Sequence, residues 1–162
     1  MSEHGFEMPR PSDAHARLAR LAGRWEADET MHPSEWSPTA SKRRATTVNR
    51  MGVDGFFLLN EYTQYEGDRA TFRGFGVYGW DPTRERYSMY WVDSMGSPPY
   101  AQVWGTWDGD TLTFQQETPR GHHRYVYVLE AEDRYVFRMA SSKDGQTWSE
   151  ILTGVYTRID DA

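Results

Sequence analysis

Residues 70–94 read ATFRGFGVYGWDPTRERYSMYWVDS and contain two runs in which large apolar residues alternate with small or polar ones. A period of two places successive side chains on opposite faces of an extended chain and is typical of a β-strand. The two runs are separated by Asp81-Pro82-Thr83, a sequence that favours a tight reversal. We therefore predict neighbouring antiparallel strands at residues 70–80 and 86–94.

The same pattern fills most of the chain. Turn-forming pairs such as Asp54-Gly55, Gly67-Asp68 and Asp144-Gly145 separate further alternating segments. The predicted strands are residues 24–32, 41–51, 55–65, 70–80, 86–94, 100–107, 111–118, 122–131, 134–141 and 147–158. No helical run interrupts them, so sequence neighbours pair as an up-and-down meander. Because closure removes exposed edges, we predict an all-β fold, a closed up-and-down antiparallel β-barrel of about ten strands.

One segment departs from this pattern. Residues 12–21, SDAHARLARL, combine a capping residue at Ser12 or Asp13 with apolar residues on one helical face, and Gly23 follows them. We predict a short N-terminal helix there. Residues 1–11 are polar and contain two prolines, so we expect a flexible N-terminal segment, followed by a single domain over residues 12–162.

Composition argues against several classes of function. A net charge of −6 and a pI near 5.3 disfavour a nucleic-acid partner, because duplex binding requires Lys and Arg to neutralise phosphates. The short basic run Lys42-Arg43-Arg44 is interpreted as a solvated strand face. The absence of cysteine excludes disulfides, thiolate metal clusters and cysteine nucleophiles. No apolar run has the length of a signal peptide or membrane span, so we expect no membrane partner and a cytoplasmic location.

The two ends of the predicted barrel resemble the calycins, or lipocalin-like proteins. Gly23-Arg24-Trp25 begins the first strand, and Gly154-Val155-Tyr156-Thr157-Arg158 ends the last. In calycins a Gly-x-Trp places the indole at the closed end of the barrel, where a basic residue from the last strand packs over it. The resemblance implies that Trp25 and Arg158 close this barrel through a cation–π contact.

A longer resemblance runs from Leu18 to Arg158. The segments that carry it are Gly76-Val77-Tyr78-Gly79-Trp80-Asp81-Pro82, Tyr87, Trp91-Val92-Asp93-Ser94-Met95-Gly96, Gly105-Thr106-Trp107-Asp108-Gly109 and Tyr156-Thr157-Arg158. They resemble the bacterial family catalogued as domain of unknown function 1579. The resemblance implies a lipocalin-like barrel, in agreement with the strand pattern, and it implies no particular activity.

Aromatic residues make up 15% of the chain, so rings must fill much of the barrel interior. Tyr87, Met89, Trp91 and Asp93 share one face of a strand. If that face is luminal, Asp93 is a general acid or base, or the hydrogen-bonding anchor of a ligand; alternatively, Asp93 only caps the loop that follows it. With neighbouring strands, the predicted lumen lining is Tyr87, Met89, Trp91, Asp93, Trp104, His123, Tyr125 and Tyr127.

Glu61 is the second candidate catalytic carboxylate, because it alternates in register with Phe57, Leu59 and Thr63. Paired with Asp93 across the barrel, it would permit general acid and base catalysis. Its alternative role is that of a structural partner for Arg73 or Arg124.

The histidines predict no metal site. His122 and His123 are adjacent, so they point to opposite faces of a strand and cannot chelate one ion together. The remaining histidines are scattered: His4, His15 and His32. We expect no metal and no cofactor.

Haem is a minor alternative. Nitrobindins are small calycin-like barrels that hold haem through one histidine, and His123 aligns with the aromatic residues Tyr125 and Tyr127. However, Glu26-Ala27-Asp28 replaces the glycines of the nitrobindin signature after Trp25, and the last two predicted strands contain no histidine.

The leading hypothesis is a barrel that binds an amphipathic or aromatic small molecule in its lumen. A second hypothesis is an enzyme that uses Asp93 or Glu61 as a general base. A third is a structural module whose lumen is packed solid and whose outer sheet face forms a homodimer.

Overall fold

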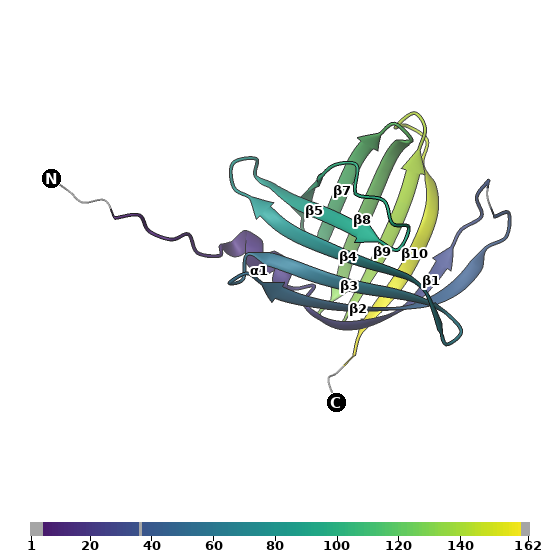
Figure 1. Cartoon of the computed structure of the whole chain (residues 1–162), viewed down its shortest axis with the longest axis horizontal. Coiled ribbons are helices and arrows are strands. Elements are labelled where there is room, and N and C mark those ends of the chain that lie inside the picture. Colours follow the sequence, from purple (N-terminus) through teal and green to yellow (C-terminus); the bar gives the residue numbers. More distant parts are fainter. Residues whose placement is uncertain (1–4, 36, 160–162) are drawn as a thin grey trace.

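The computed structural model describes residues 5–35 and 37–159. It contains one short helix followed by ten strands (Figure 1). The elements are α1 (Asp13–Ala19), β1 (Gly23–Met31), β2 (Ser41–Gly52), β3 (Phe57–Glu66), β4 (Arg69–Asp81), β5 (Arg86–Asp93), β6 (Val103–Asp108), β7 (Thr111–Thr118), β8 (Gly121–Ala131), β9 (Arg134–Ser142) and β10 (Ser149–Arg158).

The ten strands form one closed barrel. Each strand pairs antiparallel with its sequence neighbours, and β1 pairs with β10 to complete the ring. The closing register sets Trp25 opposite Arg158 and Met31 opposite Leu152. The predicted up-and-down antiparallel barrel is therefore confirmed. No helix among the described residues is long and apolar enough to cross a membrane.

Most boundaries differ from the sequence prediction by one to three residues, and two of the differences have a physical reason. The helix ends at Ala19 rather than near residue 21, because the amides of Arg20, Leu21 and Ala22 bond to carbonyls three residues back and tighten the chain into turns. β6 begins at Val103 rather than at residue 100. The preceding loop contains Pro98-Pro99, which has no N–H groups to offer a strand ladder.

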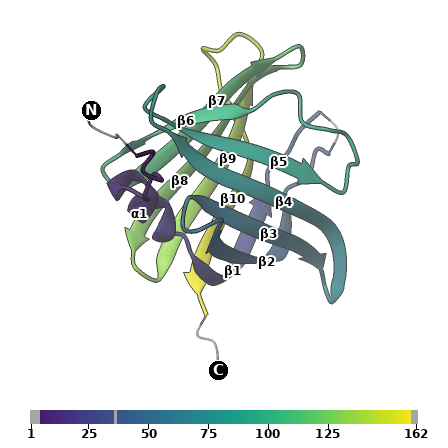
Figure 2. The ribbon, with the colours of Figure 1, turned by 60° about the vertical axis from the view of Figure 1, so that its left-hand side comes forward.

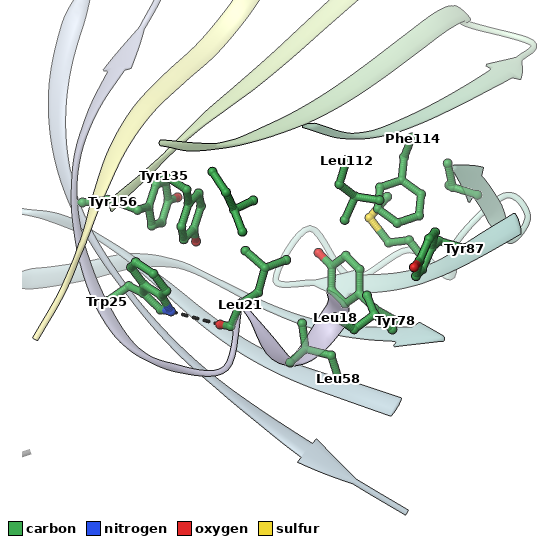
Figure 3. Close-up of a cluster of buried hydrophobic side chains, with 14 of the residues drawn as sticks. Leu18, Leu21, Trp25, Leu58, Tyr78, Tyr87, Leu112, Phe114, Tyr135 and Tyr156 are labelled. Atoms are coloured by element: carbon green, nitrogen blue, oxygen red, sulfur yellow. Dashed lines mark hydrogen bonds between the residues drawn. The ribbon is translucent and has the colours of Figure 1, made fainter. Parts of the chain in front are cut away.

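α1 lies across one end of the barrel (Figure 2). Leu18 and Leu21 have exposed fractions of 0% and 2%, and the Tyr87 hydroxyl donates to the Ala14 carbonyl at 2.9 Å. Figure 3 shows the apolar cluster that these leucines join at this end of the barrel. We call this the closed end. It supplies most of the packed core, so any luminal site lies farther along the barrel axis.

The cross-strand register identifies the residues that face the axis. Tyr87, Gly105, Phe114 and Tyr125 are successive partners across β5 to β8. Tyr87 and Phe114 are at most 1% exposed, whereas Tyr90, on the opposite face of β5, is 45% exposed. Because side chains alternate along a strand, this row fixes the inward face of each strand in the barrel.

Candidate ligand site in the open half of the barrel

Inward side chains in the half of the barrel away from α1 are less buried than those near α1. Several side chains that the register directs inward are only half-buried there: Tyr62, Gln64, Trp91, Asp93, Gln116, His123, Tyr125, Phe137 and Met139. At the closed end, inward side chains such as Trp25, Leu58 and Phe114 are at most 1% exposed. An inward side chain keeps accessible surface only where no atoms fill the space in front of it. We call this region, from Glu29 to the barrel mouth, the open half.

Glu29 is the most buried charged residue of the open half, with an exposed fraction of 1%. The Tyr62 hydroxyl donates to one carboxylate oxygen at 2.6 Å, and the Tyr156 hydroxyl donates to the other at 3.2 Å. The Gln64 amide lies 3.4 Å from the first oxygen. Gly154 is the cross-strand partner of Glu29, and a Cβ there would lie 2.9 Å from the Tyr156 ring and 3.1 Å from the Glu29 Cγ. The missing side chain therefore makes room for this carboxylate.

Burial raises the pKa of Glu29 above its ordinary value, and the three donated hydrogen bonds oppose that shift in part. The same carboxylate, together with burial, raises the pKa of Tyr62. Glu29 is thus held by neutral donors in a space with little water. Among the described residues no ion pair to Glu29 is formed, although Arg43 is its cross-strand partner on β2.

Replacing Glu29 with Gln changes how stability depends on pH. A carboxyl group whose pKa is raised in the folded state binds its proton more tightly in the folded chain than in the unfolded chain. Its contribution to the stability of the fold is therefore complete below the unfolded-state pKa. That contribution is lost as the pH rises through the folded-state pKa. Glutamine does not titrate. As pH rises above about 4, the ordinary pKa of a glutamate, we expect the unfolding free energy of E29Q to rise relative to that of the wild type. Urea titrations measure this difference. Glu61→Gln, at an exposed carboxylate, is the control, and a pH-independent difference for E29Q would contradict a raised Glu29 pKa.

Trp91 and Asp93 form the β5 wall of the open half. The Trp91 indole N–H donates to one Asp93 oxygen at 2.9 Å, and the Met95 amide donates to the other at 3.0 Å. Asp93 therefore faces inward, and its carboxylate also caps the following loop. Gly74 and Gly76 pair with Asp93 and Trp91, and a Cβ at Gly74 would overlap the Trp91 ring. These glycines let the indole lie against β4.

The wall opposite Asp93 comes from β7 and β8. Tyr125 and His123 face inward, and Gln116 donates to the Tyr125 hydroxyl at 3.4 Å. Burial is the main cause of a raised pKa at Tyr125, and the charge of Asp93 adds to it, so the two groups face the same space. Burial lowers the pKa of His123, whose Nε2 lies 3.4 Å from the Thr118 hydroxyl, so the imidazole is neutral near pH 7.

Tyr127 lies deeper than Tyr125 on the same face. Its hydroxyl lies 2.8 Å from the Tyr78 hydroxyl, and burial raises the pKa of Tyr78 to about 12. Tyr87 and Met89 also point inward, but they are 1% and 5% exposed and belong to the closed end. The expectation that Tyr87 and Met89 line an accessible lumen is wrong, because α1 packs against that part of the barrel.

Trp104 and Glu61 lie on the outer face, contrary to the sequence prediction. Trp104 pairs with Ser88 between the inward positions Val103 and Gly105, and its ring receives the Arg84 guanidinium at 4.6 Å. Glu61 is exposed and lies between the inward residues of β3. Glu61 and Asp93 therefore lie on opposite sides of the wall, and the proposed catalytic pair does not form.

Trp25 and Arg158 meet at the closed end. The guanidinium lies 4.2 Å from the centre of the indole ring and donates to the carbonyls of Ala22, Arg20 and Glu132. The indole N–H donates to the Leu21 carbonyl at 3.0 Å (Figure 3). This contact ties the first and last strands to the turn that follows α1.

Sequence reasoning missed Glu29, Tyr62 and Gln64. Glu29 alternates with Trp25 and Ala27 on β1, and the same rule that singled out Asp93 identifies it as inward once Trp25 is assigned to the core. Tyr62 and Gln64 lie on the face of β3 opposite Glu61. Assigning Glu61 to the lumen placed these two residues outside.

The outer wall carries a separate groove of about 540 Å³ over β3, β4 and β5. It is lined mainly by outward residues, including Glu61, Phe75 and Val92, and its lining also includes Tyr62 and Asp93. Within residues 5–35 and 37–159, no group of three or more His, Asp or Glu side chains is arranged to hold a metal ion.

A family model described as "Protein of unknown function (DUF1579)" matches residues 10–158. The chain belongs to this family. No curated protein matches the DUF1579 chain at the sequence level. The family match over residues 10–158 confirms the resemblance to domain of unknown function 1579 that the sequence motifs indicated.

Solved structures extend the likeness in fold. Rv2717c from M. tuberculosis superposes with a TM-score of 0.69 at 13% identity, over 92% of this chain and 99% of that one. The S-type phycobiliprotein lyase CPES from Guillardia theta gives 0.63 at 9% identity, over 94% and 96%. A DUF3598 family protein from Nostoc punctiforme gives 0.58 at 12% identity, over 88% of this chain and 49% of that one. At these identities, the similarity shows the barrel fold alone.

Proposed function

We propose that this DUF1579 protein binds a small amphipathic or aromatic molecule in the open half of its barrel. The observation that carries the proposal is the set of inward aromatic and polar side chains that keep accessible surface there, among them Trp91, His123 and Tyr125. Barrels of about this size have room for one small ligand. Apolar walls with a few converging polar groups are the usual composition of such sites.

The fold comparison supports the same proposal. The S-type phycobiliprotein lyase, whose substrates are phycobiliproteins by its name, superposes over almost the full length of both chains. A packed lumen would favour a purely structural role instead. The half-buried inward residues of the open half favour binding.

A fluorescence titration with two matched tryptophan variants tests the proposal. Trp91 faces the open half, whereas Trp104 lies on the outer wall beside Arg84. A panel of aromatic and amphipathic metabolites is titrated against wild type, Trp91→Phe and Trp104→Phe, with calorimetry as an independent measure of affinity. We expect a ligand whose quenching is largely lost in W91F and retained in W104F.

Equal quenching in the two variants would place the ligand outside the barrel and contradict the proposal. Binding of no panel member would contradict it as well. The panel includes haem, because His123 offers an inward imidazole near the mouth. A Soret shift that disappears in His123→Ala would identify haem as the ligand.

A further inference from the structure

We propose that two copies of this chain associate through the outer face of β3, β4 and β5 and the adjoining part of β2. These four strands lie side by side on one side of the barrel (Figure 2). The strand register directs six apolar side chains outward there, and we call this surface the outer patch: Val48, Leu59, Phe75, Val77, Tyr90 and Val92. The proposal concerns the outside of the barrel and does not depend on luminal binding.

The apolar side chains of the outer patch are unusually accessible. Val48, Tyr90 and Val92 have exposed fractions of 38%, 45% and 37%. Among the described residues, the other large apolar side chains with comparable exposure lie in loops or in the N-terminal segment, outside the strands. A contiguous apolar surface on a folded chain marks an interaction site, because its contact with water costs free energy that a partner removes.

The charges of the outer patch are complementary to a second copy of the same surface. Glu61 pairs with Phe75 across β3 and β4, so Arg73, two residues from Phe75, is its diagonal neighbour on the outer face. Both Glu61 and Arg73 are exposed, and neither makes an ion pair within residues 5–35 and 37–159. The patch thus holds one acid and one base, each without a partner of opposite charge in its own chain.

Two-fold symmetry matches these two charges to each other. An axis that lies along the sheet face, between Glu61 and Arg73, sets Glu61 of each copy against Arg73 of the other. One arrangement then forms two identical ion pairs, as an isologous interface requires. The groove of about 540 Å³ that Glu61, Arg73, Phe75 and Val92 line lies at the centre of this contact and gives it relief for packing.

The size of the outer patch indicates a weak dimer. Four strands about 4.8 Å apart form a face only about 15 Å wide. Stable interfaces bury roughly 800 Å² on each partner, and smaller ones belong to transient complexes. We therefore expect association in the micromolar range, with a dimer that dissociates on dilution.

Sedimentation velocity of the full-length wild type, from about 1 μM to about 1 mM, tests the dimer over the range in which a weak interface becomes populated. We expect monomer at the low end and a dimer fraction that grows with concentration. A wild-type chain that stays monomeric throughout would overturn the proposal.

Charge reversal tests the contact between copies. Glu61→Arg alone and Arg73→Glu alone each set like charges opposite one another, so each variant should dimerise at least roughly tenfold more weakly than the wild type. An equimolar mixture of the two variants restores opposite charges at both contacts and should dimerise about as well as the wild type. Circular dichroism checks that each variant keeps its barrel. Association that is not weakened in the single variants, or not recovered in the mixture, would contradict the reciprocal pairing of Glu61 with Arg73.

A pair of valine substitutions tests the apolar part of the patch. Val92→Lys places a charge in the centre of the proposed interface, and we expect it to abolish the dimer. Val136→Lys is the matched control, because Val136 is an outward valine of β9 that lines a separate groove of about 270 Å³. It should leave association unchanged. The reverse result would place the interface on β9 and overturn the assignment to the outer patch.

The N-terminal segment is the other candidate occupant of the groove. Phe6 and Met8 are 86% and 70% exposed, so this segment of a second copy has apolar side chains to offer. We expect Phe6→Ser combined with Met8→Ser to leave association unchanged in the full-length chain. Loss of the dimer in this variant would assign the groove to the N-terminal segment and overturn the face-to-face arrangement.

Discussion

Trp25→Ala should lower the unfolding free energy by about 3–5 kcal/mol, the usual cost of removing a large aromatic side chain from a packed core. The indole is 1% exposed, packs edge-on against Tyr135 at 4.7 Å, and is covered by Arg158. Its loss leaves a cavity where the first and last strands meet and removes the donor to the Leu21 carbonyl. Urea unfolding followed by circular dichroism measures the change.

Trp104→Ala is the matched control, because it deletes the same side chain from the outer wall. There the ring is only half-buried and contacts Arg84, so we expect a loss of about 1 kcal/mol or less. Equal destabilisation by the two substitutions would mean that Trp25 does not organise the closed end.

Gly74→Val should abolish detectable ligand binding and cost about 1–3 kcal/mol of stability through overpacking. A side chain at this position would overlap the Trp91 ring, which lies against β4. The indole must then swing into the open half, where it would occupy the space proposed for the ligand and lose its hydrogen bond to Asp93. Calorimetric titration and urea unfolding measure the two effects.

Two further variants separate a blocked site from a damaged fold. Thr71→Val adds no bulk and lies on an exposed outward position of the same strand, so binding should persist. Combining Gly74→Val with Trp91→Ala removes the clash and should recover most of the lost stability, since the two positions are coupled by direct contact. A double variant as unstable as the sum of the single ones would show that Gly74 matters for another reason.

The fold could be predicted from sequence because every strand carries the same two signals. Alternation marks the strand, and short turns such as Asp81-Pro82-Thr83 leave only neighbouring antiparallel pairs. Alternation also grouped Trp91 with Asp93, and Tyr125 with Tyr127, on shared faces, and the structure places all four inward.

Alternation shows which residues of a strand share a face, but it does not show which of the two faces points into the barrel. In β6 the inward residues flanking Trp104 are Val103 and Gly105, so the bulk of the indole favoured the wrong face. In β3, Glu61 was assigned to the lumen because it shares a face with the apolar residue Leu59. The core residue of this strand is Leu58, which lies on the other face. Cross-strand register decided both cases, and register depends on pairing that a single strand does not specify.

The alternation of side chains also does not show how far along the barrel axis a residue lies. Tyr87 and Trp91 share a face, yet α1 packs against the part of the barrel around Tyr87 and leaves the part around Trp91 accessible. The end that a short N-terminal helix covers depends on the packing of Leu18 and Leu21 inside the barrel. That packing separates the core from the site.

A crystal structure of the protein with the tightest-binding member of the ligand panel tests the luminal site most directly. The account predicts one molecule inside the barrel, between Trp91, His123 and Tyr125, with α1 still closing the opposite end. A ligand held only in the outer groove beside Phe75 and Val92, with side chains filling the open half, would contradict it.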